Sequence, residues 1–164
     1  MNDETKVLVA SLDYQRRHVL GILEGLSEEQ LRRPVLPSGW NCLGMVKHLA
    51  QDDEHFWFRC IVAGESLDVF QVGPNHGNDE WKVDTDESAE DVFSLYRDEI
   101  ARSSAIIEST PLDAAPRQEA DWWGKGDFPD HRYILLHVIA ETACHAGHLD
   151  AVRELLDGRQ WIVL

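Results

Sequence analysis

The sequence lacks the features that mark several large classes of protein. Its 164 residues contain no apolar run approaching the roughly 18 residues that a membrane-spanning helix requires. The first residues, MNDETKVLVASLDYQRR, are acidic where a secretory signal is basic, and no export cleavage pattern follows them. We therefore expect a cytoplasmic protein that does not contact a membrane.

Cysteine and basic residues are also scarce. Three cysteines, Cys42, Cys60 and Cys144, are an odd number without the spacing of a disulfide framework, which indicates a reducing environment. We expect all three to be packing residues, the commoner role of a free cysteine. Only 15 lysines and arginines accompany 30 acidic residues, giving a formal net charge of −15, and no basic cluster interrupts the acidity. Such a field repels nucleic acid, so we predict no nucleic-acid partner.

Four stretches have the spacing of amphipathic helices, whereas none of useful length alternates as a strand does. The predicted helices cover residues 4–25, 41–64, 88–109 and 130–158. Ser38 or Asn41 is the candidate N-cap of the second helix. Ser88 is the candidate N-cap of the third, and Gly158 is expected to end the fourth. The chain is therefore predicted to be one domain, residues 1–164, with the all-α architecture of a four-helix bundle.

Two long connections, at about residues 65–86 and 110–129, separate the last three predicted helices. Segments of this length without secondary structure are uncommon in compact domains and are often functional. The second connection contains EADWWGKGDFPD, in which Trp122 and Trp123 are adjacent. Aromatic side chains in a loop commonly cover one end of a bundle. The alternative is that these two tryptophans line a substrate pocket.

The fourth predicted helix carries titratable residues where a bundle helix is normally apolar. Alternating steps of four and three select the row Ile134, Val138, Glu141, His145, His148, Val152 and Leu155. A buried carboxylate or imidazole costs several kcal/mol unless it is paired or coordinated, and one divalent metal ion satisfies several such groups. A hydrogen-bonded core histidine is the competing interpretation, which suits a lone histidine better than two histidines with a glutamate. Glu141 and His145, at i and i+4, can reach one ion. His148 is expected either to be a further ligand of the metal or to contact one of the ligands or the substrate.

The second predicted helix offers further candidate ligands in HLAQDDEH. His48, Asp52 and His55 lie at i, i+4 and i+7, close to one line along an α-helix. An exposed polar face is the simpler interpretation of His55, and both interpretations stay open for Asp52. His48 flanks Leu49 at the edge of the apolar side.

Two segments give the chain a resemblance to a known family. SGWNCLGMVKHLAQDDEHFWF is similar to the second-helix signature of the DinB/YfiT-like metal-binding bundles, and HVIAETACHAGHLDAVRELLDG resembles their fourth-helix signature. The resemblance is closest to the branch associated with mycothiol S-transferases. By position it implies the metal ligands His48, Glu141 and His145. Many members have histidine in place of Glu141 and glutamine in place of His148, but the set is similar to the His/Glu/His site of mycothiol-dependent maleylpyruvate isomerase.

The expected function follows from this ligand set and from the resemblance. Three protein ligands leave one coordination position open, and a thiol bound there loses its proton at neutral pH. We expect a divalent-metal-dependent S-transferase that uses zinc, or alternatively nickel, and joins mycothiol to an electrophilic small molecule. The resemblance also implies homodimers, since relatives often dimerise.

Other functions fit parts of the same pattern. A hydrolase that activates water on the metal and a non-catalytic, metal-bound stress-response bundle both stay open. The absence of HExxH argues against the common metalloproteases. A di-iron bundle needs repeated Glu-x-x-His motifs, and only Asp52-x-x-His55 approximates one.

Overall fold

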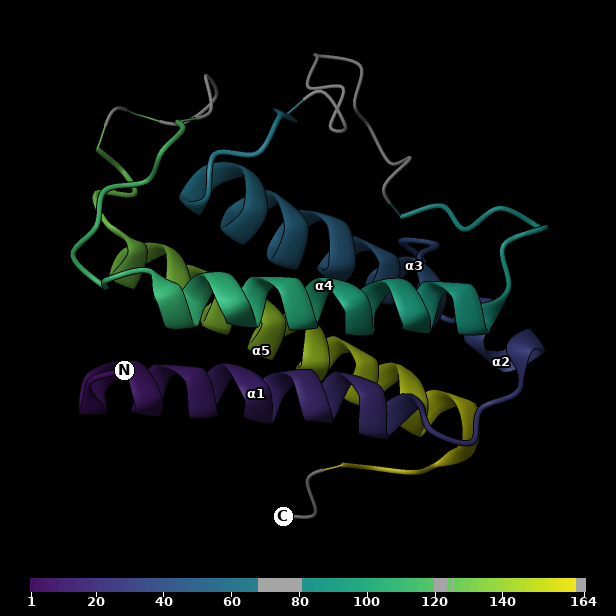
Figure 1. The fold of residues 1–164 in the computed structure, drawn as a ribbon. Coiled ribbons are helices and arrows are strands. Elements are labelled where there is room, and N and C mark those ends of the chain that lie inside the picture. Colours follow the sequence, from purple (N-terminus) through teal and green to yellow (C-terminus); the bar gives the residue numbers. More distant parts are fainter. Residues whose placement is uncertain (68–80, 120–123, 125, 162–164) are drawn as a thin grey trace.

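The computed structural model describes residues 1–67, 81–119, 124 and 126–161, and the regular secondary structure among them is entirely helical. Figure 1 shows the long helices side by side: α1 (Asp3–Leu23), α3 (Cys42–His48) with its continuation η1 (Leu49–Val62), α4 (Ala89–Ser109) and α5 (His131–Asp157). α1 packs chiefly on α5 and α4 chiefly on η1, so these two pairs form the layers of the bundle. The predicted all-α helical bundle is confirmed.

Most helix ends lie at the predicted capping residues. Asn41, rather than Ser38, caps α3, because its side chain accepts a hydrogen bond from the Gly44 N–H. Ser88 caps α4 in a capping box with Asp91. Gly158 ends α5 in the left-handed conformation, with φ 81°.

A short helix, α2 (Glu28–Arg32), lies in the connection after α1, where the apolar spacing predicts none. The Gln30 N–H donates to the Ser27 hydroxyl at 3.2 Å, and the Ser27 N–H donates to the Gln30 side chain at 2.9 Å. The sequence LSEEQLRR therefore contains a complete capping box, which is the signal that identifies this helix. Leu31 anchors it in the core.

The second long helix changes its winding after His48. α3 is an α-helix, whereas η1 is a π-helix, in which N–H groups bond to carbonyls five residues earlier. The wider turn brings residues four apart onto one face. Buried residues accordingly recur in groups about four residues apart: Leu49 and Ala50, Asp53 and Glu54, Phe56 to Phe58, and Cys60 to Val62. The π winding therefore sets which side chains of this helix enter the core.

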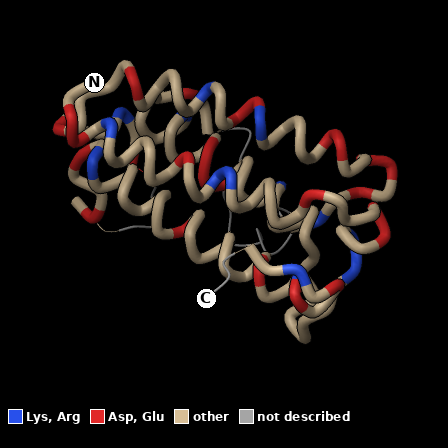
Figure 2. Tube along the Cα trace, turned by 90° about the horizontal axis from the view of Figure 1, so that it is seen from below, with Lys and Arg blue, Asp and Glu red and all other residues tan. Residues whose placement is uncertain are grey.

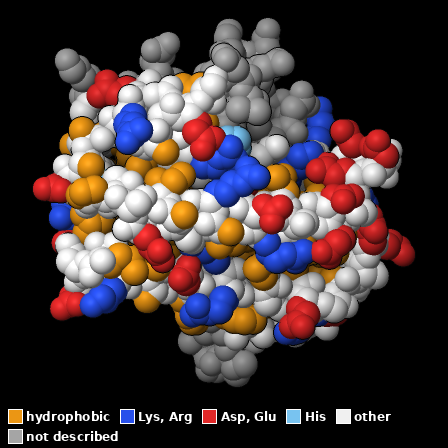
Figure 3. Space-filling model, in the orientation of Figure 1, with side chains coloured by type: hydrophobic (Ala, Val, Ile, Leu, Met, Phe, Trp, Pro, Cys, Tyr) orange, Lys and Arg blue, Asp and Glu red, His pale blue; other side chains and the backbone are white. Residues whose placement is uncertain are grey.

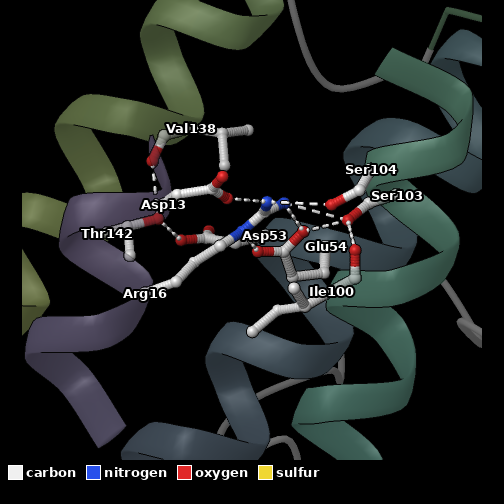
Figure 4. A network of polar contacts seen from close by, with 9 residues as sticks. All are labelled: Asp13, Arg16, Asp53, Glu54, Ile100, Ser103, Ser104, Val138 and Thr142. Carbon is white, nitrogen blue, oxygen red and sulfur yellow. Dashed lines mark hydrogen bonds and ion pairs between the residues drawn. The ribbon is translucent and has the colours of Figure 1, made fainter. Parts of the chain in front are cut away.

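This winding brings two acidic residues into the centre of the bundle. Asp53 and Glu54 are 3% and 0% exposed. Together with Arg16, Ser103 and Thr142 they form a buried polar layer between the helices (Figure 4). Two apolar clusters lie on either side of this layer, one nearer α2 and one nearer the first residue of α5.

An ion pair between α1 and η1 dominates the polar layer (Figure 4). The Arg16 guanidinium donates from Nε to Glu54 Oε1 at 2.8 Å and from Nη2 to Glu54 Oε2 at 2.6 Å. Nη2 also donates to the Ser103 hydroxyl of α4 at 3.0 Å. Three helices are thus joined through one guanidinium, and the two-pronged geometry fixes the rotation of η1 relative to α1.

Asp53 lies beside Glu54 in the same buried layer. Burial raises the pKa of the Asp53 carboxyl well above its usual value, and the nearby charges of Glu54 and Glu141 raise it further. The Thr142 hydroxyl lies 3.4 Å from Asp53 Oδ2 and donates to the Val138 carbonyl at 2.7 Å. Asp53 therefore fills the space between η1 and α5 in surroundings that favour its protonated form.

The surface carries the acidity of the sequence. Acidic residues occur along every long helix, with fewer basic residues among them (Figure 2). On the face shown in Figure 3, acidic, basic and hydrophobic side chains are interspersed. Of the helices described, none combines the length and apolarity that crossing a membrane requires.

Replacing Arg16 with methionine should destabilise the protein by about 3–5 kcal/mol, because Glu54 is left as an uncompensated buried charge. Urea unfolding measures the change. The double variant Arg16→Met/Glu54→Met should regain much of the lost stability. Arg17→Met is the control, since Arg17 is exposed and its loss should change stability by no more than about 0.5 kcal/mol. Equal effects at Arg16 and Arg17 would contradict this account.

Candidate functional site

Three histidines from two helices lie together at the side of the bundle. His48 is the last residue of α3, and His145 and His148 belong to α5. The rings of His48 and His145 meet edge to face, with their centres 5.0 Å apart, and those of His145 and His148 lie 5.7 Å apart. Glu141 is one turn before His145, and its Oε2 lies 3.7 Å from His145 Nε2. The structure thus brings His48, Glu141 and His145 into one cluster.

The cluster lies at the edge of the buried face of α5. The predicted row follows that face at Ile134, Val138 and Val152 but departs from it at Glu141, His145, His148 and Leu155. Thr142, Ala146 and Leu149 fill the middle of the buried face, whereas Leu155 is 63% exposed. An α-helix has 3.6 residues per turn, so a row built from steps of four and three drifts off the buried face. The side chain of His145 is 12% exposed and that of Glu141 44%. The burial of His145 and Glu141 therefore does not by itself require that they share a metal ion. Their position at the edge of the buried face leaves both side chains accessible to a ligand.

Asp52 holds His48 in one orientation. Its Oδ2 lies 2.6 Å from His48 Nδ1, one turn away along the chain. With Nδ1 engaged by the carboxylate, Nε2 is the nitrogen of His48 that is left for a further ligand. A carboxylate on the far nitrogen of a histidine is the usual support of a metal-binding imidazole.

His55 lies in a different electrostatic environment. Burial lowers its pKa, and the charged groups acting on it are those of Arg59, Glu99, Glu65 and Arg102. The predicted line through His48, Asp52 and His55 assumes α-helical winding, whereas this segment is π-helical. Residues seven apart share a face in an α-helix, but they do not share one in this π-helical segment.

His145 is held in its neutral form. Burial, followed by the nearby His48 and His148, lowers its pKa from 6.5 to about 4. Its Nδ1 is buried without a hydrogen-bond partner among the residues described. A neutral imidazole is the form that binds metals, because the ligand nitrogen must carry a free electron pair.

The spacing of the two rings suits a shared ion. Two imidazoles bound to one tetrahedral zinc ion, with about 2 Å per nitrogen, have ring centres roughly 5 Å apart. His48 and His145 have this separation. As the side chains stand, however, no three His, Cys, Asp or Glu groups of the described segments form a complete ligand set.

Two tryptophans flank the histidines. The indole of Trp81 stacks on the His48 ring, with centres 4.1 Å apart and an interplanar angle of 15°. Trp40 lies against His148 at 6.3 Å. Neither was identified from the sequence, because both lie outside the periodic stretches. The predicted pocket residues Trp122 and Trp123 lie outside the described residues.

The cysteines differ from one another in their surroundings. Cys42 and Cys60 are buried, as expected, and burial raises the pKa of each thiol to about 11. Cys144 is exposed, so its prediction as a packing residue is wrong. Its Sγ lies 4.0 Å from His148 Nδ1, on the outer side of α5.

Comparison with known proteins agrees with the resemblance seen in the two motifs. The family model described as mycothiol-S-transferase matches residues 7–158, which includes the histidine cluster and all the long helices apart from the first residues of α1. No curated protein and no solved structure matches the chain. Since the match spans nearly the whole sequence, the chain belongs to the mycothiol S-transferase family.

Proposed function

We propose that this protein is a divalent-metal-dependent S-transferase that joins mycothiol to an electrophilic small molecule. His48, Glu141 and His145 would hold the metal ion, with zinc as the first candidate and nickel as the alternative. The observation that carries the proposal is the pair of imidazoles 5.0 Å apart in a member of the mycothiol S-transferase family.

The residues of the cluster suit this role in different ways. Asp52 fixes the ring of His48 through Nδ1, and His145 is neutral at physiological pH because its pKa is about 4. Glu141 is partly exposed, so its carboxylate can rotate toward the two rings to complete the ligand set. Three such ligands leave a coordination position for the thiol.

A divalent ion bound here would supply a Lewis acid that lowers the pKa of a coordinated thiol. His148, exposed beside His145, is our candidate for the group that accepts the thiol proton. Its Nδ1 faces Cys144, so Nε2 is the proposed acceptor. The sulfur then forms a bond to the electrophilic carbon, and the leaving group departs with the electron pair of the bond that breaks.

The surroundings of the cluster favour a neutral, apolar electrophile. Trp81 and Trp40 present aromatic surfaces next to the histidines, and we propose Trp122 and Trp123 as further walls of the pocket. The formal net charge of −15 disfavours anionic substrates. Three free cysteines suit a cytoplasmic enzyme, and we retain the homodimer as a prediction to be tested by light scattering.

Removal of one proposed ligand should remove the metal and the activity together. Wild-type protein purified without chelating resin should contain about one zinc or nickel per chain by inductively coupled plasma mass spectrometry. His145→Ala and Glu141→Gln should lose metal, and the rate of mycothiol conjugation should fall by more than about 100-fold. His55→Gln is the matched control and should retain both. A folded His145→Ala protein with full metal content would contradict the proposal, and substrate turnover without any thiol would favour the hydrolase.

Replacement of His148 should separate proton transfer from metal binding. We expect His148→Gln to keep its metal and to lose about 10²- to 10⁴-fold in kcat, because the general base is gone. Steady-state kinetics beside metal analysis measures both quantities. Loss of metal from this variant would instead make His148 a ligand, and an unchanged kcat would remove it from the mechanism.

The metal-free protein should lose stability as the pH falls from 6.5 to about 4. In this window the unfolded chain binds a proton at His145 that the folded chain does not, because burial and the neighbouring histidines lower the folded pKa to about 4. The loss from this residue should be at most about 3 kcal/mol, complete below pH 4. Urea unfolding at several pH values should give a shallower slope for His145→Gln than for wild type. Identical slopes would show that His145 titrates normally.

A further inference from the structure

The segment of residues 81–88 is held against α3 by an unusually close backbone contact. A Cβ atom placed on Gly44 would lie 2.2 Å from the carbonyl oxygen of Trp81. Gly44 has ordinary helical geometry within α3, so its backbone conformation does not require glycine. The absence of a side chain is what allows the Trp81 backbone to approach the helix.

Polar contacts secure the rest of the same segment. Lys47 Nζ forms an ion pair with Glu87 Oε2 at 2.7 Å. The Arg32 guanidinium donates to the carbonyl of Asp84 at 3.3 Å and also to that of Glu87. The segment is therefore fixed to α2 and α3 along its length, and the Trp81 backbone has little freedom to move.

The fixed backbone sets the indole of Trp81 on the face of His48. The two rings are nearly parallel, with their centres 4.1 Å apart, and the indole also lies in a T-shaped contact with the His145 ring, with centres 5.8 Å apart. The contact of Asp52 with Nδ1 prevents the His48 imidazole from turning within its own plane. The stacked indole of Trp81 prevents that plane from tilting. Together the two contacts leave the Nε2 atom one direction in which to point.

We propose that Trp81, docked on Gly44, is a positioning residue that orients the His48 imidazole for the metal ion. This inference rests on the proposed function, since it assumes that His48 is a ligand. A ligand that is already oriented loses less conformational freedom on binding, which raises metal affinity. Trp81 would thus act on the metal through His48, without touching it.

Cobalt(II) titration of the metal-free protein tests this role. We would measure the affinity by competition with a chromogenic chelator and the ligand geometry by the visible absorption of the bound cobalt. Trp81→Leu keeps apolar volume but removes the stacked ring, and it should weaken cobalt binding by about 10- to 100-fold and change the spectrum. Gly44→Ala should do the same, because its Cβ displaces the Trp81 carbonyl. Trp81→Phe keeps a ring on His48 and should restore affinity to within about threefold of wild type.

Trp161→Leu is the matched control, because Trp161 stacks on a different histidine, His18, at 5.2 Å and 16°. It should bind cobalt like the wild type. Wild-type affinity in folded Trp81→Leu and Gly44→Ala proteins would overturn the positioning role and leave the proposed metal site intact. Equal weakening in Trp81→Phe and Trp81→Leu would also overturn it, as stacking would not matter. Failure of the wild type to bind cobalt would instead overturn the proposed function, and this inference with it.

Discussion

The two-pronged ion pair between Arg16 and Glu54 is the constraint on which the rest of the bundle depends. It lies in a polar layer between two apolar clusters and joins α1, η1 and, through Ser103, α4. Where helices meet only through apolar contacts, rotating one against the other costs little free energy. Separating a buried carboxylate from its guanidinium costs several kcal/mol. The pair therefore sets the rotation of η1, and the end of α3 that carries His48 is continuous with it.

The sequence was sufficient for the long helices but neither for α2 nor for the winding of η1. Amphipathic spacing and the caps at Ser88 and Gly158 predicted the long helices, because these signals are local. The winding of η1 can be recognised only when the buried acids Asp53 and Glu54 are counted with the buried apolar residues before and after them. Acidic residues are normally read as exposed, so this four-residue period was hidden. On α5 the small side chains of Thr142 and Ala146 hid the true buried face in the same way.

The candidate site shows a similar division. The motifs around His48 and His145 predicted that these two residues, nearly 100 positions apart in the sequence, lie together. The structure brings them together, with Glu141 beside them. The support of His48 by Asp52 follows from i, i+4 spacing and could have been predicted with more attention to its geometry. The stack of Trp81 on His48 could not, because it depends on where a long connection returns to the bundle and on the close approach at Gly44.

These features combine into one account, in which a polar layer orients the helices and the helix edges present the proposed ligands of a metal ion. Anomalous X-ray diffraction from crystals of the protein, recorded at the absorption edge of its native metal, tests this account most directly. It predicts a single strong peak within bonding distance of His48 Nε2, His145 and Glu141. A peak elsewhere, or coordination by Cys144 in place of Glu141, would contradict the proposed ligand set and the chemistry built on it.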